Sequence, residues 1–190
     1  MMSPYFVVVD NAPAARIVER ILADPHARVV NARVRSSAMM RASGILQDEG
    51  APTVLLLDSD SLEERAIVEE QLETGGYLRR GSAGHPNRLV LAIPQVEAVL
   101  FSDRTGLEKA LGRELSEDEA FEARFRPRAV FHRILGDQSD VQERAVEVIG
   151  RIDDVSLRRM AAHAVIREIQ GFVEDARSGR AKATRVRRAS

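Results

Sequence analysis

Two aspartates, Asp58 and Asp60, directly follow an apolar run in the middle of the sequence. The run, residues 53–57, contains only β-branched and aliphatic side chains, which is typical of a strand buried on both faces of a parallel sheet. Two carboxylates this close repel each other unless a cation or protons lie between them, and Mg2+ prefers oxygen ligands. The pair is therefore a candidate metal site, although a turn rich in Asp and Ser would give the same pattern.

Two further acids follow apolar runs elsewhere in the chain. Asp10 ends a run near the N-terminus, and Glu97 lies shortly after a third run. In a parallel sheet with short crossovers all strands end at one edge, so we expect Asp10, Asp58, Asp60 and Glu97 to converge there. Four carboxylates could hold one or two divalent cations, Mg2+ or Mn2+, an arrangement that suits phosphodiester cleavage.

The elements that would position these acids alternate between strand and helix over the first part of the chain. We expect strands at 5–9, 27–33, 53–58 and 89–93. Helices are expected between them, at 12–23, 36–47 and 62–72, and Gly75–Gly76 is expected to end the third. This alternation predicts an α/β domain over residues 4–104, built on a mostly parallel sheet flanked by helices.

From Thr105 onward the pattern is helical and predicts an appendage over residues 105–176. Ser116 and Glu119 match the S-x-x-E capping box that opens a helix. Further helices are expected at 105–111, 140–152 and 156–175. Apolar side chains after the capping box predict a small core there: Phe121, Phe125, Val130, Phe131, Ile134 and Leu135.

Composition narrows the class of protein. The 190 residues are 44% hydrophobic and 30% charged, with no cysteine, which excludes thiolate chemistry and leaves oxygen or histidine ligands for any metal. The absence of a membrane span and of a signal-peptide pattern predicts a cytoplasmic protein. The net charge of −1 hides a basic, acid-free segment at 177–190. We expect a disordered tail there, which could bind phosphates or remain solvated.

The order of the acids resembles that of the Toprim domain, which topoisomerases, primases and the overcoming-lysogenization-defect nucleases share. The segment that runs from Ile93-Pro94 through Glu97 to Asp103 is similar to the I-P-x-x-E-x-W-L-x-x-D segment of stand-alone Toprim-like proteins in the nuclease branch, with Val99 in place of the aromatic residue. The resemblance covers about residues 4–104. It implies a Toprim/Rossmann-like sheet with a C-terminal helical appendage.

The resemblance also implies roles for the acids. Asp58, Asp60 and Glu97 would be metal ligands, and Asp10 would stand where the family has its first glutamate. Asp10 is one methylene shorter than that glutamate, and Asn11 replaces the glycine that normally follows it. The hypothesis is a Mg2+-dependent (or Mn2+-dependent) nuclease that acts on DNA or RNA, in which all four acids are both metal-binding and catalytic.

Nucleic acid is the expected partner, and arginines are the expected phosphate contacts. A separately encoded partner such as an ATPase is conceivable by analogy with the family, an oligomer is compatible with the sequence, and no membrane is expected. The candidate phosphate-binding residues lie near the fourth strand and in the tail: Arg79, Arg80, Arg88, Arg185, Arg187 and Arg188.

Two alternatives remain open at the level of sequence. The shorter Asp10 is compatible with a catalytically inactive Toprim-like subunit that binds nucleic acid or regulates a partner. Asp10 and Asp58 also occupy the positions of the acids in a receiver-like phosphoacceptor domain. A receiver needs a lysine at a later strand end, and the only lysines, Lys109 and Lys182, follow no expected strand.

Overall fold

The sheet of this protein is formed by four parallel strands in the order β2-β1-β3-β4. The computed structural model describes residues 4–136 and 139–181. The strands are short, and the six residues of β3 are all buried, which explains their unbroken apolar run. The strands are β1 (Tyr5–Val9), β2 (Ala27–Asn31), β3 (Thr53–Asp58) and β4 (Asn87–Ala92). The predicted α/β class is confirmed.

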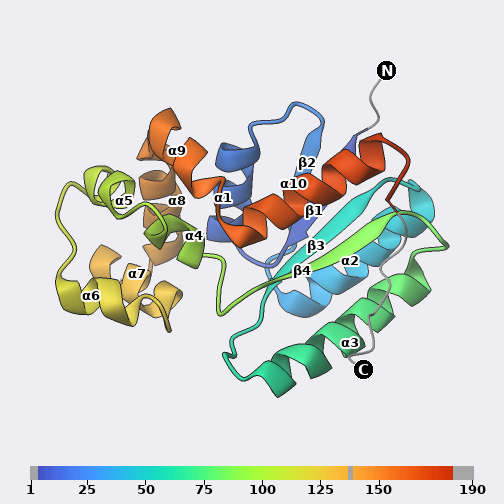
Figure 1. Ribbon diagram of the computed structural model, residues 1–190, viewed down its shortest axis with the longest axis horizontal. Helices are drawn as coiled ribbons and strands as arrows, with labels where there is room; N and C mark the ends of the chain where they lie inside the picture. The colour runs from blue at the N-terminus through green and yellow to red at the C-terminus, as the bar shows by residue number, and fades with distance from the viewer. Residues whose placement is uncertain (1–3, 137–138, 182–190) are drawn as a thin grey trace.

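Helices cover both faces of the sheet (Figure 1). Along β3, Leu56 faces the core shared with α1, whereas Leu55 and Leu57 face the core shared with α2 and α3, because successive strand residues point to opposite faces. The crossover helices are α1 (Ala12–Leu22), α2 (Arg35–Asp48) and α3 (Glu64–Gly81). Each of these three helices returns the chain to the edge where the next strand begins, so all four strands end together at the opposite edge.

The C-terminal helices pack on the α1 side of the sheet. Helix α8 lies against α1 and α10 lies against β4, so Phe131 and Ile166 share one core with Val7 of β1. Whether residue 104 divides two domains remains a prediction. The helices are α4 (Ala98–Phe101), α5 (Arg104–Leu111), α6 (Glu117–Glu122), α7 (Pro127–Leu135), α8 (Val141–Arg151), α9 (Asp154–Met160) and α10 (Ala164–Arg177).

Helix ends are set partly by capping and partly by packing. The predicted capping box is present, with the Ser116 hydroxyl accepting from the Glu119 N–H and the Glu119 carboxylate accepting from the Ser116 N–H. The predicted end of α3 at Gly75–Gly76 is wrong, because both glycines are buried in the interior of a helix that continues to Gly81. Tertiary packing there overrides the low helix propensity of glycine.

Several residues expected in the core are exposed instead. Phe121 and Phe125 are 61% and 49% exposed and pack on each other edge to face, with ring centroids 5.5 Å apart. Leu62, which precedes α3, and Leu72, which lies within it, are exposed as well. The helix expected over 156–175 is two helices, and the side chain of His163 caps the second. No helix within residues 4–136 and 139–181 is long and apolar enough to cross a membrane.

Replacing Gly106 with alanine is expected to lower the free energy of unfolding by about 1–3 kcal/mol. A Cβ atom at this position of α5 would lie 2.3 Å from Oγ of Ser156 and 2.8 Å from Oδ2 of Asp103, and Ser156 is itself buried. Urea denaturation measures the change. The matched control is Gly171→Ala in α10, where a Cβ meets nothing within 4 Å. Equal stability changes in the two variants would contradict close packing of α5 on α9.

Candidate acidic site at the carboxyl edge of the sheet

Asp58 and Glu97 lie together at the carboxyl edge of the sheet, joined by an arginine from the C-terminal helices. Asp58 is the last residue of β3, and Glu97 precedes α4 just after β4. Asp58 is 4% exposed and Glu97 is fully buried. Nε of Arg128 donates to Oε1 of Glu97 at 2.8 Å, and its Nη2 lies 3.3 Å from Oε2 of Glu97 and also pairs with the Asp58 carboxylate. We call Asp58, Glu97 and Arg128 the acidic triad.

The loop after β4 holds the triad in place. Oδ1 of Asp58 accepts a hydrogen bond from the backbone N–H of Val96 at 2.7 Å. The N–H of Ser59 donates to the Ala92 carbonyl, so pairing continues past the end of β3. Helix α7 begins with Pro127, which suits the first turn of a helix, and Arg128 therefore projects from the first turn of that helix. The site is assembled from three separate parts of the chain.

Asp60 and Asp10 have partners of their own. Asp60 adopts a left-handed backbone conformation, and its Oδ1 accepts from Nε2 of Gln95 at 2.7 Å. Oε1 of Gln95 in turn accepts from the backbone N–H of Arg128 at 3.2 Å, so Asp60 is linked to the triad through one side chain. Asp10 accepts from Nδ2 of Asn11 at 2.9 Å.

The structure thus brings together two of the four acids expected to converge. Across residues 4–136 and 139–181, no group of three or more Asp, Glu or His side chains is placed to hold a metal ion. The metal-binding and catalytic roles assigned to Asp10, Asp58, Asp60 and Glu97 stay predictions.

Burial dominates the electrostatics of the triad. It raises the pKa of Asp58 from 3.8 to about 6, the charge of Glu97 adds to this effect, and Arg128 and the N–H of Val96 oppose it. Burial also disfavours the charged form of Arg128, but the neighbouring carboxylates raise its pKa above the ordinary value. The guanidinium therefore remains charged. When both acids are ionised, the triad carries a net charge of −1.

A second polar cluster, formed by Arg35, Ser59 and Glu70, connects the end of β3 to α2 and α3 on the other face of the sheet. Nη1 of Arg35 donates to the backbone carbonyl of Asp58 at 2.8 Å, and Arg35 also pairs with Glu70. Oγ of Ser59 donates to the same carboxylate at 2.9 Å. Sequence analysis missed both Arg35 and Arg128. The only signal for Arg128 is an arginine beside a helix-starting proline, and nothing in the sequence links it to acids some thirty and seventy residues away.

The arginines expected to contact phosphates lie away from the acids. Arg88, at the start of β4, lies 3.6 Å from Glu168 and over the ring of Phe172. Because Ala92 is in register with Asp58, Arg88 lies about 13 Å along the strand from the site. Arg79 and Arg80 are exposed in the last turn of α3, next to the same end of the sheet as Arg88. Their phosphate-binding role stays a prediction, and Arg185, Arg187 and Arg188 lie outside the described residues.

A hollow adjoins the triad on the side of Asp60 and Gln95. Its volume is about 530 Å3, within the roughly 300–1,000 Å3 typical of small-ligand sites. Phe125 and Arg126 form part of its wall, and both side chains are exposed. An aromatic face and a guanidinium thus lie beside the acids, a combination that suits an unpaired base and its phosphate.

A parallel sheet covered on both faces, with acids at its carboxyl edge, defines an α/β fold of the Toprim/Rossmann-like type. Among solved structures, the chain is similar to the C-terminal region of the Burkholderia pseudomallei OLD protein. The match has a TM-score of 0.53 and 15% sequence identity, and covers 93% of this chain and 99% of that one. At this identity the similarity establishes the fold, and it confirms the predicted resemblance to the overcoming-lysogenization-defect branch at that level. No protein-family model matches the chain, and no curated protein matches it in sequence.

Proposed function

We propose that this chain is a Toprim-like nuclease that cleaves phosphodiester bonds in DNA or RNA with Mg2+ or Mn2+. The observation that carries the proposal is the burial of Asp58 and Glu97 side by side at the carboxyl edge of the sheet. Open α/β sheets place their ligands at this edge. Two buried carboxylates are costly unless a cation lies between them, so the fold maintains a site with affinity for positive charge.

The donor atoms suit a divalent cation, but Arg128 takes its place in this arrangement. The oxygens of Asp58 and Glu97 are hard ligands of the kind that Mg2+ prefers, and both contact the guanidinium. A cation fits these residues only when Arg128 has moved away. Asp58 and Glu97 would then hold it, with Asp60 and Asp10 as the proposed additional acids. A bound divalent cation activates water and stabilises the leaving oxygen of a phosphodiester.

Other side chains of the site would orient the nucleic acid. Gln95 connects Asp60 to the start of α7 and so fixes the wall of the hollow relative to the triad. Phe125 offers a ring face on which a base can stack, and Arg126 offers a charge for a backbone phosphate. These contacts favour a strand whose bases are unpaired near the point of cleavage.

A non-cleaving subunit that binds nucleic acid or regulates a partner is the second candidate. Arg128 already satisfies both carboxylates of the triad, and Asp10 is held by Asn11 rather than by the triad. A receiver-like phosphoacceptor is not favoured, because the Asp58 carboxylate is buried and engaged by both Arg128 and Val96.

The test compares the wild-type chain with Asp58→Asn on labelled single-stranded and duplex DNA and RNA. We expect cleavage that needs Mg2+ or Mn2+, stops with a chelator and is lost in Asp58→Asn. Asparagine can still accept from the Val96 N–H, so the local fold is kept. The matched control is Asp48→Asn, an exposed acid at the end of α2, which should cleave at the wild-type rate.

Two outcomes separate the candidates. Undiminished cleavage by Asp58→Asn would contradict the assignment of the acidic triad. If the wild-type chain binds nucleic acid in a mobility-shift assay but cleaves none of the substrates with either metal, the non-cleaving subunit replaces the nuclease.

A further inference from the structure

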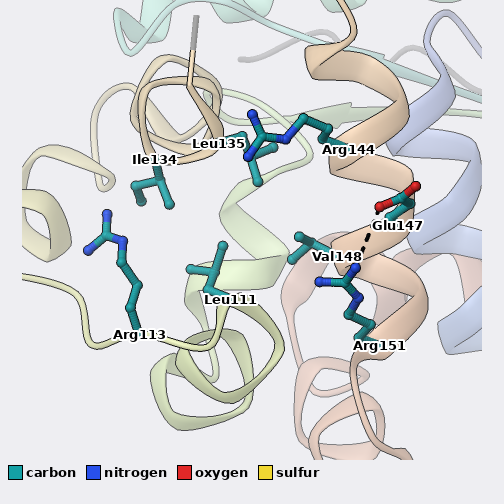
Figure 2. Close-up of a pocket in the computed structure, with 8 residues that line it drawn as sticks. All are labelled: Leu111, Arg113, Ile134, Leu135, Arg144, Glu147, Val148 and Arg151. Atoms are coloured by element: carbon teal, nitrogen blue, oxygen red, sulfur yellow. Dashed lines mark ion pairs between the residues drawn. The ribbon is translucent and has the colours of Figure 1, made fainter. Parts of the chain in front are cut away.

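A second hollow lies among the C-terminal helices. It is lined by residues of α5, α7 and α8 and of the loop after α5, has a volume of about 350 Å3, and contains both apolar and charged side chains. Its apolar residues are Leu111, Ile134, Leu135 and Val148, and its charged residues are Arg113, Arg144, Glu147 and Arg151 (Figure 2). None of these residues belongs to the acidic triad or to the hollow beside it.

The guanidinium groups of Arg113, Arg144 and Arg151 differ in their hydrogen-bond and ion-pair partners. Arg113 makes a two-bond pair with Glu119, with N–O distances of 2.6 and 3.0 Å, and so forms a fixed wall. Arg151 lies 3.5 Å from Glu147, and both side chains are more than 60% exposed, which makes this pair weak. Among residues 4–136 and 139–181, no side chain forms a hydrogen bond or ion pair with Arg144. Among these described residues, Arg144 and Arg151 are thus held less firmly than Arg113.

Arg144 and Arg151 lie on one face of α8. Positions 144, 148 and 151 follow the helical spacing that places side chains in a row, and Val148 lies between the two charges. Arg144 and Arg151 are separated by two turns, about 10.5 Å along the axis. Figure 2 shows the guanidinium of Arg144 beside Leu135 and that of Arg151 turned toward Glu147, with Val148 next to it. This separation is too large for one small anion to contact both arginines. A ligand with two adjacent anionic groups can contact both guanidinium groups.

We propose that this hollow binds a small molecule with adjacent phosphate groups and an apolar or planar body, of the type of a nucleoside diphosphate. The phosphates bind between Arg144 and Arg151, where guanidinium groups donate paired hydrogen bonds to phosphate oxygens. Arg151 gives up its weak contact with Glu147 to do so. The body of the ligand covers Leu111 and Ile134, which form the floor beside Arg113.

The experiment is isothermal titration of the full chain with ADP and, separately, with inorganic pyrophosphate. EDTA is present throughout, so that no divalent cation can link a nucleotide to the acidic triad. We expect ADP to bind, and to bind more tightly than pyrophosphate because only ADP has a body that covers the floor. Arg144→Gln and Arg151→Gln should each weaken ADP binding about tenfold or more, as the loss of charge-assisted hydrogen bonds predicts.

The controls distinguish this site from the acidic triad and from general charge. Arg167→Gln removes an exposed charge from α10 and should leave ADP binding within about twofold, since its charge is remote and screened. Asp58→Asn should also bind ADP normally, whether or not the chain proves to be a nuclease. Equal losses in Arg144→Gln and Arg167→Gln would overturn the proposal. So would equal affinities for ADP and pyrophosphate, or the absence of binding at millimolar ADP.

Discussion

Replacing Arg128 with alanine is expected to lower the free energy of unfolding by about 3–5 kcal/mol at neutral pH. The change leaves Asp58 and Glu97 buried without the guanidinium that contacts both, and breaking a buried ion pair from one side costs far more than the pair contributes. Urea denaturation in the presence of EDTA measures the loss. The matched control is Arg133→Ala, which removes an exposed ion pair with Glu122 from the same helix and should cost at most about 1 kcal/mol.

Divalent cations should return part of the stability that Arg128→Ala loses. With the guanidinium gone, the two carboxylates are free to bind Mg2+ or Mn2+, and a cation at a hundred times its dissociation constant stabilises the fold by about 2.7 kcal/mol. The wild-type chain should gain less, because the cation must first displace Arg128. A gain of the same size in both proteins, or no gain in either, would contradict cation binding at the Asp58–Glu97 pair.

The stability of the wild-type chain relative to Asp58→Asn is expected to fall as the pH rises from 4 to 7. The pKa of Asp58 is about 6 in the folded chain and near 3.8 when unperturbed. Between these values the folded chain keeps a proton that the unfolded chain has released. The contribution of Asp58 is therefore fully present below about pH 3.8 and is lost as the pH passes through 6. The difference between the two pKa values corresponds to about 3 kcal/mol.

Denaturation of both proteins at several pH values between 4 and 7 measures this difference. The free energy of unfolding of Asp58→Asn should rise relative to the wild type by up to about 3 kcal/mol over that range. Parallel curves would show that Asp58 ionises in the folded chain as it does in water, and that the triad is open to solvent.

The sheet could be predicted from the sequence because its information is local. Three of the strands contain apolar runs, and the acid or turn residue after each run marks its end, so β1, β3 and β4 follow directly from the pattern. The capping box at Ser116 is local for the same reason. The end of α3 predicted at Gly75–Gly76 is wrong because burial, rather than helix propensity, determines the conformation of these two glycines. The prediction that Phe121 and Phe125 are buried is wrong, because hydrophobic type alone does not show whether a side chain packs in a core.

The acidic site could be predicted only in part. Strand direction places Asp58 and Glu97 at one edge, which is a consequence of topology. The partner of both acids comes from α7, and no pattern in the sequence specifies how that helix docks on the sheet. The spacing of Asp60 from Asp58 predicts that both belong to one cluster of acids. The left-handed backbone conformation of Asp60 instead directs its carboxylate to Gln95. Side-chain direction after a strand end depends on backbone torsions that residue types leave open.

The origin of Arg128 in the C-terminal half has a consequence for the order of folding during synthesis. A ribosome releases the whole sheet, with Asp58 and Glu97, before residue 128 emerges. Until α7 docks, Arg128 is not in contact with these two carboxylates, so the edge of the nascent sheet must stay hydrated. Burial of Asp58 and Glu97 in the N-terminal half therefore depends on α7, which is synthesised later. The side chain of Arg128 links the two parts of the chain at this step.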